Sequence, residues 1–326
     1  MATTTELPGL DAAERRRAPA AAAPVHAQLM KAVLSREAFS DPDWLYERKL
    51  DGIRCLAIRD GDAVRMLSRN DLDLSARYPE LCDALAAQPH RRFAVDGEVV
   101  AFDRNQTSFA RLTQRGHRNV KVFYYVFDIL WFDGFDVEGL GLRARKRLLR
   151  AALQSTGSLR LSTHRNRDGE AMFAHACRQG WEGVIAKRAE SPYRATRSRD
   201  WLKFKCEAGQ ELVIGGFTAP RGSRTELGAL LLGYYDGGEL HYAGKVGTGF
   251  DRQALRELGG LLGPLERATA PFADAGSIRE PGVTWVTPKL VAQVAFTEWT
   301  RAGRLRHPRF QGLRVDKFAE QVVRER

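Results

Sequence analysis

The sequence predicts an α+β protein of two domains, in which antiparallel sheets with helices are followed by a small β-barrel. At 326 residues with 44% hydrophobic content, the chain is long enough for two domains of ordinary size. Residues 26–207 alternate β-patterned runs with helical patterns, whereas from residue 208 onward short strands and Gly-rich turns dominate. No apolar run reaches the length of a membrane span.

The first 25 residues are rich in alanine and lack the apolar core of a secretory signal. We therefore expect residues 1–25 to be a disordered leader of a cytoplasmic protein. A helical pattern follows from Val25 to Phe39, and Asp41-Pro42-Asp43 ends it.

Lys and Arg number 51 against 40 acidic residues, which gives a net charge of +11 and a pI near 9.7. This balance favours a polyanionic partner without identifying it; a merely basic protein is the alternative. Only ten residues are lysine, and arginine cannot serve as an amine nucleophile. Five of the ten lie in the motif stretches described below: Lys49, Lys187, Lys203, Lys205 and Lys317.

Four cysteines lie far apart and form no Cys-x-x-Cys pair. This spacing supports neither a structural zinc site nor a disulfide framework. We expect reduced thiols.

Residues 45–54 predict a strand that runs into a turn at Asp51-Gly52. Glu47 and Lys49 are two residues apart and project from one face. Strands predicted over 53–59 and 63–69 complete three antiparallel strands around Lys49, with Arg54 and Arg69 near it. A lysine whose pKa is lowered by burial or by neighbouring cations can act as a nucleophile. The alternative is a surface hairpin with a solvated lysine.

After a helix over 74–87, residues 92–102 predict a strand with Asp96 and Glu98 on one face. A metal, a ribose hydroxyl or an arginine would satisfy these carboxylates; the alternative is an ion pair on a solvated face. Residues 122–130 predict a buried strand whose aromatics are core or stacking residues. The basic helix predicted over 143–153 is either a solvated face or a phosphate-backbone contact.

A helix over 170–179 and strands over 181–188 and 201–205 follow. Alternation in the last strand sends Lys203 and Lys205 to one face, where an anion between them would relieve their repulsion. A triphosphate fits this requirement, and the two lysines would also help to lower the pKa of Lys49.

Beyond residue 208 the pattern matches a five-stranded OB barrel, a fold that often binds nucleic acid. The expected elements are strands over 211–217, 229–235, 239–246, 283–286 and 290–299 and a helix over 251–262. In the basic tail 301–326, apolar and aromatic anchors between the charges favour a docking element over a solvated tail.

From about Asp41 to the C-terminus, the chain resembles the covalent nucleotidyltransferases and, among them, the ATP-dependent DNA ligases. The motifs that carry the resemblance occur in one order: Lys49 to Arg54, Ser68-Arg69-Asn70, Asp96-Gly97-Glu98, Val126-Phe127-Asp128, Glu182 to Lys187, Leu202 to Lys205, and Arg314 to Lys317. Ser191-Pro192-Tyr193, Tyr242 to Phe250 and Leu305 to Pro308 are similar to the ligase domain of the bacterial ligase D family, whose members repair double-strand breaks by end joining.

The resemblance implies a nucleotidyltransferase (adenylation) domain of ATP-grasp-like antiparallel sheets with helices over 26–207. An OB-fold domain with a basic C-terminal motif would occupy 208–326. It also implies three steps: Lys49 attacks ATP to form a lysyl-AMP, the AMP passes to a DNA 5'-phosphate, and a 3'-hydroxyl displaces AMP and seals the strand. A hinge near residues 206–210 would let the OB domain close for the first step and turn to DNA for the others.

By the same resemblance, Glu47 reads the adenine edge, Phe127 stacks on the base, and Arg54 and Glu98 hold the ribose or the nick phosphate. Asp51, Glu98 and Glu182 would position Mg²⁺ or Mn²⁺. The remaining roles are phosphate contacts: Lys203 and Lys205 at the α-phosphate, Arg69 at a phosphate, and Arg314, Asp316 and Lys317 at the pyrophosphate.

The expected partner is nicked or broken double-stranded DNA, with no membrane and with the protein as a monomer. A Ku-type end-binding protein is a further partner that the end-joining relatives suggest. An RNA ligase or a capping guanylyltransferase shares the lysine chemistry, and a non-catalytic DNA-end-binding module shares the fold. An NAD-dependent ligase is disfavoured because a four-cysteine zinc module is absent. The chain has no room for polymerase or phosphoesterase domains, so we expect a stand-alone ligase or part of a split system.

Overall fold

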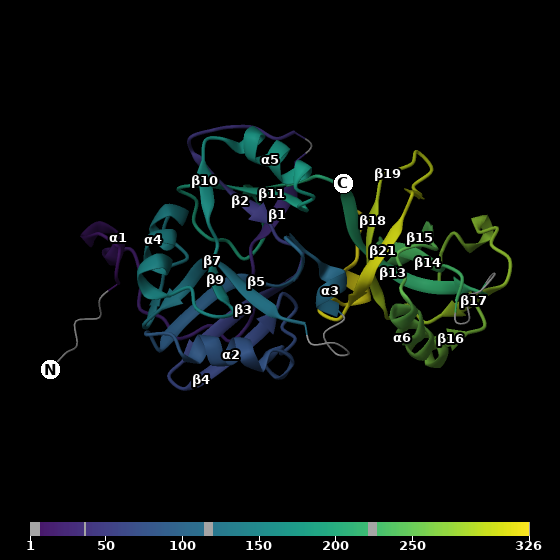
Figure 1. Ribbon diagram of the computed structural model, residues 1–326, viewed down its shortest axis with the longest axis horizontal. Coiled ribbons are helices and arrows are strands. Elements are labelled where there is room, and N and C mark those ends of the chain that lie inside the picture. Colours follow the sequence, from purple (N-terminus) through teal and green to yellow (C-terminus); the bar gives the residue numbers. More distant parts are fainter. Residues whose placement is uncertain (1–6, 36, 114–119, 221–226, 326) are drawn as a thin grey trace. The chain divides into compact units, whose positions relative to one another are not determined.

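The computed structural model describes residues 7–35, 37–113, 120–220 and 227–325, which divide into two compact units (Figure 1). The first unit ends at Cys206 and the second begins at Glu207. None of the described helices is long and apolar enough to cross a membrane.

The first unit contains two sheets. One, here the β5 sheet, has the order β4-β3-β5-β7-β8. Its strands are β3 (Ile53–Asp60), β4 (Ala63–Ser68), β5 (Arg92–Asp103), β7 (Val122–Phe132) and β8 (Phe135–Asp136), joined by β6 (Gln106–Thr107) and β9 (Leu159–Leu161) at its margins. The other, here the β2 sheet, has the order β1-β12-β11-β2-β10. Its strands are β1 (Lys31–Leu34), β2 (Trp44–Lys49), β10 (His164–Asn166), β11 (Gly183–Arg188) and β12 (Arg197–Lys205).

The expected three-stranded arrangement around Lys49 is wrong. β2 pairs with β11 and β10, whereas β3 and β4 belong to the β5 sheet. The residues Asp51-Gly52 therefore carry the chain between two sheets and do not close a hairpin. Gly52 is required there by close approach, because a Cβ atom at this position would lie 2.1 Å from the carbonyl oxygen of Val99 on β5.

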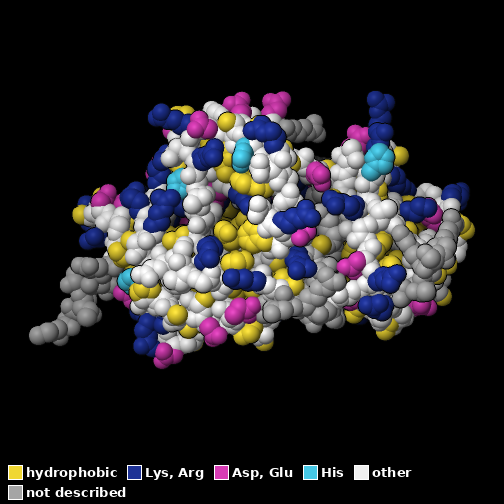
Figure 2. Space-filling model, in the orientation of Figure 1, with side chains coloured by type: hydrophobic (Ala, Val, Ile, Leu, Met, Phe, Trp, Pro, Cys, Tyr) yellow, Lys and Arg dark blue, Asp and Glu magenta, His cyan; other side chains and the backbone are white. Residues whose placement is uncertain are grey.

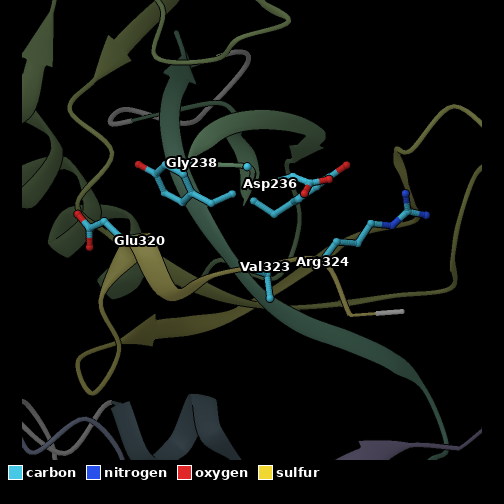
Figure 3. Close-up of a pocket in the computed structure, with 8 residues that line it drawn as sticks. Asp236, Gly238, Glu320, Val323 and Arg324 are labelled. Carbon is cyan, nitrogen blue, oxygen red and sulfur yellow. The ribbon is translucent and has the colours of Figure 1, made fainter.

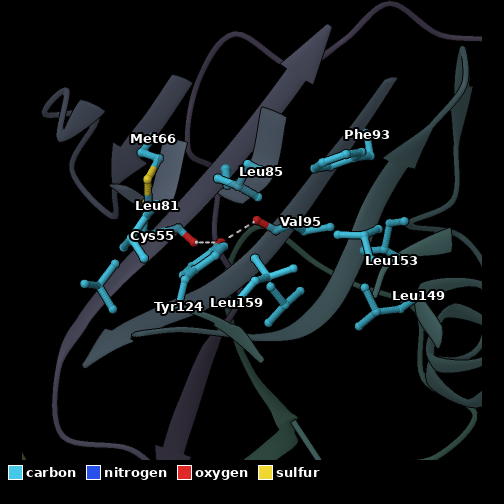
Figure 4. Close-up of a cluster of buried hydrophobic side chains, with 14 of the residues drawn as sticks. Cys55, Met66, Leu81, Leu85, Phe93, Val95, Tyr124, Leu149, Leu153 and Leu159 are labelled. Atoms are coloured by element: carbon cyan, nitrogen blue, oxygen red, sulfur yellow. Dashed lines mark hydrogen bonds between the residues drawn. The ribbon is translucent and has the colours of Figure 1, made fainter. Parts of the chain in front are cut away.

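The β5 sheet buries most of the first unit's core (Figure 4). Tyr124 lies at the centre of this core, where its hydroxyl donates to the carbonyl oxygens of Cys55 and Val95, at 2.8 and 2.9 Å. The helices of the unit are α1 (Ala12–Arg16), α2 (Pro79–Ala86), α3 (Phe109–Thr113), α4 (Leu142–Ala152) and α5 (Gly169–Arg178). Leu81 and Leu85 of α2 and Leu148 and Leu149 of α4 belong to the same cluster, so these helices cover the sheet.

The N-terminal segment corrects two expectations. Residues 7–25 are ordered, since Leu7, Leu10 and Ala18 join the core of the first unit and Asp11 caps α1. Residues 1–6 lie outside the described part of the chain. The helix expected from Val25 to Phe39 is also wrong, because β1 forms there and pairs in parallel with β12. Pairing with β12 and burial of Leu29 and Met30 outweigh a weak helical pattern.

The second unit is built on β13 (Ala208–Thr218), which pairs with β14 (Leu230–Asp236), β17 (Val283–Val286) and β18 (Val291–Phe296). Three further strands extend this sheet: β15 (Glu239–Val246), β16 (Glu266–Arg267) and β21 (Arg309–Arg314). A separate two-stranded sheet is formed by β19 (Glu298–Trp299) and β20 (Leu305–Arg306). Helix α6 (Arg252–Leu262) packs Leu255, Leu258 and Leu262 against the core. The expected OB-fold elements are present, and the α+β expectation for the whole chain is confirmed. The tail expected to dock contributes a strand, β21, that pairs with β18.

The cysteine expectation is wrong in one respect. Cys177 of α5 and Cys206, the residue after β12, form a disulfide, while Cys55 and Cys82 are free thiols. Spacing did not reveal the pair because the helix and the strand meet only in the fold.

Candidate active site

Lys49 ends β2 and lies opposite Gly183 of β11, which in turn lies opposite Lys205 of β12. Glu47, Ile185 and Lys203 form a second such row. Paired residues of adjacent strands project from the same face of a sheet, so one face carries Glu47, Lys49, Lys203 and Lys205 together. The other face is apolar, with Tyr46, Val184, Ala186 and Phe204 in one cluster. The β2 sheet thus separates a polar face from a core.

Gly183 lies between Lys49 and Lys205 and places no side chain there. Its φ is +150°, and a Cβ atom there would lie 1.8 Å from the carbonyl oxygen of Phe204. Only glycine fits such a position.

The ammonium of Lys49 is ion-paired with Glu182. Burial alone would lower the pKa of Lys49, but Glu182, Glu98 and Asp51 together raise it above its usual value. This corrects the expectation that neighbouring cations lower that pKa, because the largest charge effects on the amine come from carboxylates. In this state Lys49 is a protonated amine.

Asp51 is held in place from α3 and β6. Its carboxylate accepts from the backbone N–H of Phe109 at 3.0 Å, and its own N–H donates to the hydroxyl of Thr107 at 3.2 Å. Glu98 lies opposite Arg54 in the β3–β5 pair. The described residues include no group of three or more His, Cys, Asp or Glu side chains close enough to form a metal site. Mg²⁺, however, is usually held by one or two carboxylates with substrate phosphates, so Asp51, Glu98 and Glu182 fit a metal that arrives with a nucleotide.

Glu47 is buried, and two lysines hold it. Lys146 of α4 lies 2.6 Å from one carboxylate oxygen and Lys187 of β11 lies 3.1 Å from the other. Burial would raise the pKa of Glu47, yet Lys146 and Lys187 bring it below its usual value. Burial also lowers the pKa of Lys187 to about 8, against the opposing effect of Glu47. Glu47 is therefore a buried anion.

Phe127 lies beside Lys187, the lysine of β11 that is paired with this carboxylate. The ammonium of Lys187 is 4.1 Å from the ring centroids of both Phe127 and Trp201, which meet edge to face at 6.1 Å. Aromatic faces beside a buried hydrogen-bond acceptor form a site suited to a planar base with an amino edge.

Arg54 is hydrogen-bonded to another side chain of the protein. Its guanidinium makes two hydrogen bonds to Asp96, at 2.6 and 3.0 Å, and Tyr193 donates to the same carboxylate at 2.7 Å. An arginine was one of the partners expected for Asp96, and Arg54 is that arginine. The guanidinium also lies 5.4 Å from the Phe127 centroid, so Arg54 borders the base site.

Arg69 follows β4 and contributes to a group of cations around Lys31. Burial, followed by the charges of Arg69, Arg197 and Arg54, lowers the pKa of Lys31. Such a concentration of positive charge is suited to a phosphate.

The remaining predicted residues lie in the second unit. Arg314 makes hydrogen bonds of 2.7 and 2.8 Å to Asp316, and Lys317 lies 3.1 Å from Glu211. These contacts order the C-terminal motif at the end of β21.

The same unit has a cavity of about 550 Å³ lined by Tyr234, Tyr235, Asp236, Glu320, Val323 and Arg324, with two glycines (Figure 3). Its lining includes none of the predicted site residues. Across the face shown in Figure 2, Lys and Arg side chains are spread over both units and do not gather in one patch.

Sequence reasoning missed Lys146. Lys146 lies in a basic run that was read as a solvated face or a phosphate contact, but Arg145 and Lys146 are both buried. Arg145 is paired with Asp128 at 2.8 Å. The apolar residues at 142, 144, 148 and 149 mark the same helical face, and they are the signal that could have revealed it.

Comparison with known proteins identifies the class. Residues 24–205 match the family described as ATP dependent DNA ligase domain, and residues 223–317 match the ATP dependent DNA ligase C terminal region. This chain belongs to the ATP-dependent DNA ligases, and the expected resemblance is confirmed.

Among curated proteins, the multifunctional non-homologous end joining protein LigD of Pseudomonas aeruginosa is 40% identical over 293 residues, covering 87% of this chain and 35% of that protein. LigD of Mycobacterium tuberculosis is 40% identical over 286 residues, covering 86% and 37%. The chain thus spans about a third of the length of these relatives. A solved structure described as mycobacterial DNA ligase D complexed with ATP and MES aligns with a TM-score of 0.68 at 37% identity, covering 91% of this chain and 98% of that one.

Proposed function

We propose that this protein seals 5'-phosphate/3'-hydroxyl nicks or breaks in DNA through a covalent lysyl-AMP on Lys49, in repair by end joining. The observation that carries the proposal is the polar face of the β2 sheet, where Lys49 lies in one row with Lys205 and beside Glu47 and Lys203. A nucleophile, an acceptor for a base and cations for phosphates are thereby held on rigid strands. The similarity to LigD proteins supports the repair role.

In the first step the Nζ of Lys49 forms a bond to the α-phosphorus of ATP, and the bond to pyrophosphate breaks. The amine loses its proton in this step, and Glu182 is the group paired with it. Lys203 and Lys205 neutralise the α-phosphate as charge develops there. Glu47 accepts from the amino group of adenine, and Phe127 stacks on the ring.

In the second step an oxygen of the DNA 5'-phosphate attacks the same phosphorus, the P–N bond breaks, and Lys49 regains a proton. The 3'-hydroxyl then attacks the DNA phosphorus and AMP leaves. By the family resemblance we assign Arg54 and Arg69 to a DNA phosphate, and Arg314, Asp316 and Lys317 to the pyrophosphate of the first step. Mg²⁺ or Mn²⁺, held by Asp51, Glu98 and Glu182, would supply positive charge that favours loss of the lysine proton and stabilises phosphate charge.

The direct test is to incubate the protein with Mg²⁺ or Mn²⁺ and ATP labelled at the α-phosphate, denature it, and measure covalent label before and after a chase with nicked DNA. We expect label on the wild type and on Lys121→Met, no label on Lys49→Met, and transfer of the label with strand sealing. Label from GTP alone would indicate a guanylyltransferase. Sealing confined to RNA would indicate an RNA ligase. DNA binding without label would indicate an end-binding module, with Ku-type proteins as partners to test.

A further inference from the structure

Glu47 is held from two sides by lysines of different elements. Lys187 reaches one oxygen from the neighbouring strand β11, and Lys146 reaches the other from helix α4. Ser162 lies 3.5 Å from the Lys187-bound oxygen. Lys146 forms an ion pair with the other carboxylate oxygen of Glu47 at 2.6 Å, without the geometry of a directed hydrogen bond. This oxygen can therefore still accept a hydrogen bond from a ligand.

The two lysines differ in what a bound base would do to them. The Lys187 ammonium lies over the rings of Phe127 and Trp201, 4.1 Å from each centroid. A purine stacked on Phe127 occupies this space. Lys146 contacts no aromatic ring among the described residues and is almost fully buried, so it stays with Glu47 when the base enters.

Helix α4 is fixed beside this pair. The guanidinium of Arg145, the residue before Lys146, is buried and makes hydrogen bonds of 2.8 and 2.9 Å to Asp128 of β7 and one of 3.0 Å to the carbonyl oxygen of Ser191. This anchor sets the position of α4 against the β5 sheet. Lys146 therefore approaches Glu47 from a rigid support.

We propose that Lys146 is the positioning residue that keeps Glu47 ionised and in place, and that it thereby sets the preference of Lys49 for ATP over GTP. The inference rests on the proposed lysyl-AMP chemistry. A fixed carboxylate accepts from the amino group that adenine carries at C6 and repels the carbonyl oxygen that guanine carries there. Without a cation beside it, the buried carboxylate would take up a proton or turn away.

The charges that face Glu47 come from every element around it. Lys146 lies on α4 and Lys187 on β11, while Asp128 on β7 acts on Lys187. His164 lies opposite Glu47 in the β2–β10 pair; burial, together with Lys146, lowers its pKa to about 4, so it is neutral near pH 7. Lys146 and Lys187 are therefore the cations that keep Glu47 ionised.

The test compares the wild type, Lys146→Met, Lys146→Arg and the exposed control Lys121→Met. Covalent labelling is measured with α-labelled ATP and with α-labelled GTP over a pH series, alongside sealing of nicked DNA that already carries the 5'-adenylate. For Lys146→Met we expect the KM for ATP to rise and the ATP-to-GTP preference to fall, each on the order of tenfold, as for a lost hydrogen bond to a charged group. The acidic limb of labelling should move to higher pH, because Glu47 then takes up a proton more readily.

Sealing of the pre-adenylated nick by the control Lys121→Met should stay at the wild-type rate, and Lys146→Arg should restore the preference and the pH limb. A folded Lys146→Met protein with wild-type selectivity and pH limb would overturn the inference. If that variant does not fold, Glu47→Gln/Lys146→Met, which removes both charges, must lose the preference, and a retained preference overturns the inference. A wild type that takes label from neither nucleotide would overturn the proposed function itself, and this inference with it.

Discussion

Lys49, the last residue of β2, forms an ion pair with Glu182. Glu182 directly precedes Gly183, which lies opposite Lys49 in the β2–β11 pair. With Glu98 and Asp51, this carboxylate raises the pKa of an amine that burial would otherwise lower. Since the proposed attack needs the unprotonated amine, we propose that the pair holds Lys49 in a resting form until a nucleotide binds.

Substituting Glu182 by Gln should therefore have two effects. The rate of label formation falls because Glu182 no longer positions the amine or a metal, by at least about 100-fold. The limb of the pH profile along which activity rises as Lys49 loses its proton moves to lower pH because an anion is removed. A pH series of single-turnover labelling measures both effects, and an unmoved limb would contradict the role given to the pair.

Substitution of Gly183 by Ala should destabilise the first unit by about 3 kcal/mol, since the added Cβ meets the carbonyl oxygen of Phe204 at a strained φ. Gly61→Ala is the matched control. Gly61 also has a positive φ, but nothing lies within 4 Å of its Cβ position, so a cost of about 1 kcal/mol is expected. Urea denaturation measures both, and equal costs would show that space at Gly183 is not limiting.

Reduction of the Cys177–Cys206 disulfide should lower the free energy of unfolding of the first unit by about 3 kcal/mol, because the bond closes a loop between residues 29 apart. Denaturation with and without a reducing agent measures the change. Cys177→Ser should match the reduced wild type and stop responding to the reductant, whereas Cys82→Ser should respond as the wild type does. Identical curves for oxidised and reduced wild type would contradict the pairing.

Truncation of Leu10 should also be costly, because this side chain lies in the core of the first unit. Leu10→Ala should cost about 3 kcal/mol. Val25 is 62% exposed, so Val25→Ala should stay within about 0.5 kcal/mol. A Leu10→Ala variant as stable as Val25→Ala would instead support the expectation that residues 1–25 are disordered.

DNA binding should weaken steeply with salt. Phosphate contacts by Lys and Arg release counterions, so the log–log slope of affinity against salt should be about −0.9 for each phosphate neutralised. Titrations of nicked duplex at several salt concentrations give the slope. Affinity independent of salt would rule out this binding mode.

Local patterns predicted the strands and helices of both units well, from β5 and β7 to α6. Pairing was harder: the alternation that placed Glu47 with Lys49 and Lys203 with Lys205 is a local property, whereas the partner of β2 is a strand more than a hundred residues away. The same limit hid Lys146, whose position depends on how α4 packs, and the disulfide, which joins a helix to a strand end. The sign of the pKa shift at Lys49 also depends on neighbours that only the fold brings together.

The central claim is that Lys49 carries the nucleotide. Its most direct test is to incubate the protein with ATP and a divalent metal, digest it, and locate the modified peptide by mass spectrometry. The account predicts one adenylyl group, linked to Lys49 and removed on addition of nicked DNA. An adenylyl group on another residue, or none on a protein that still seals DNA, would contradict it.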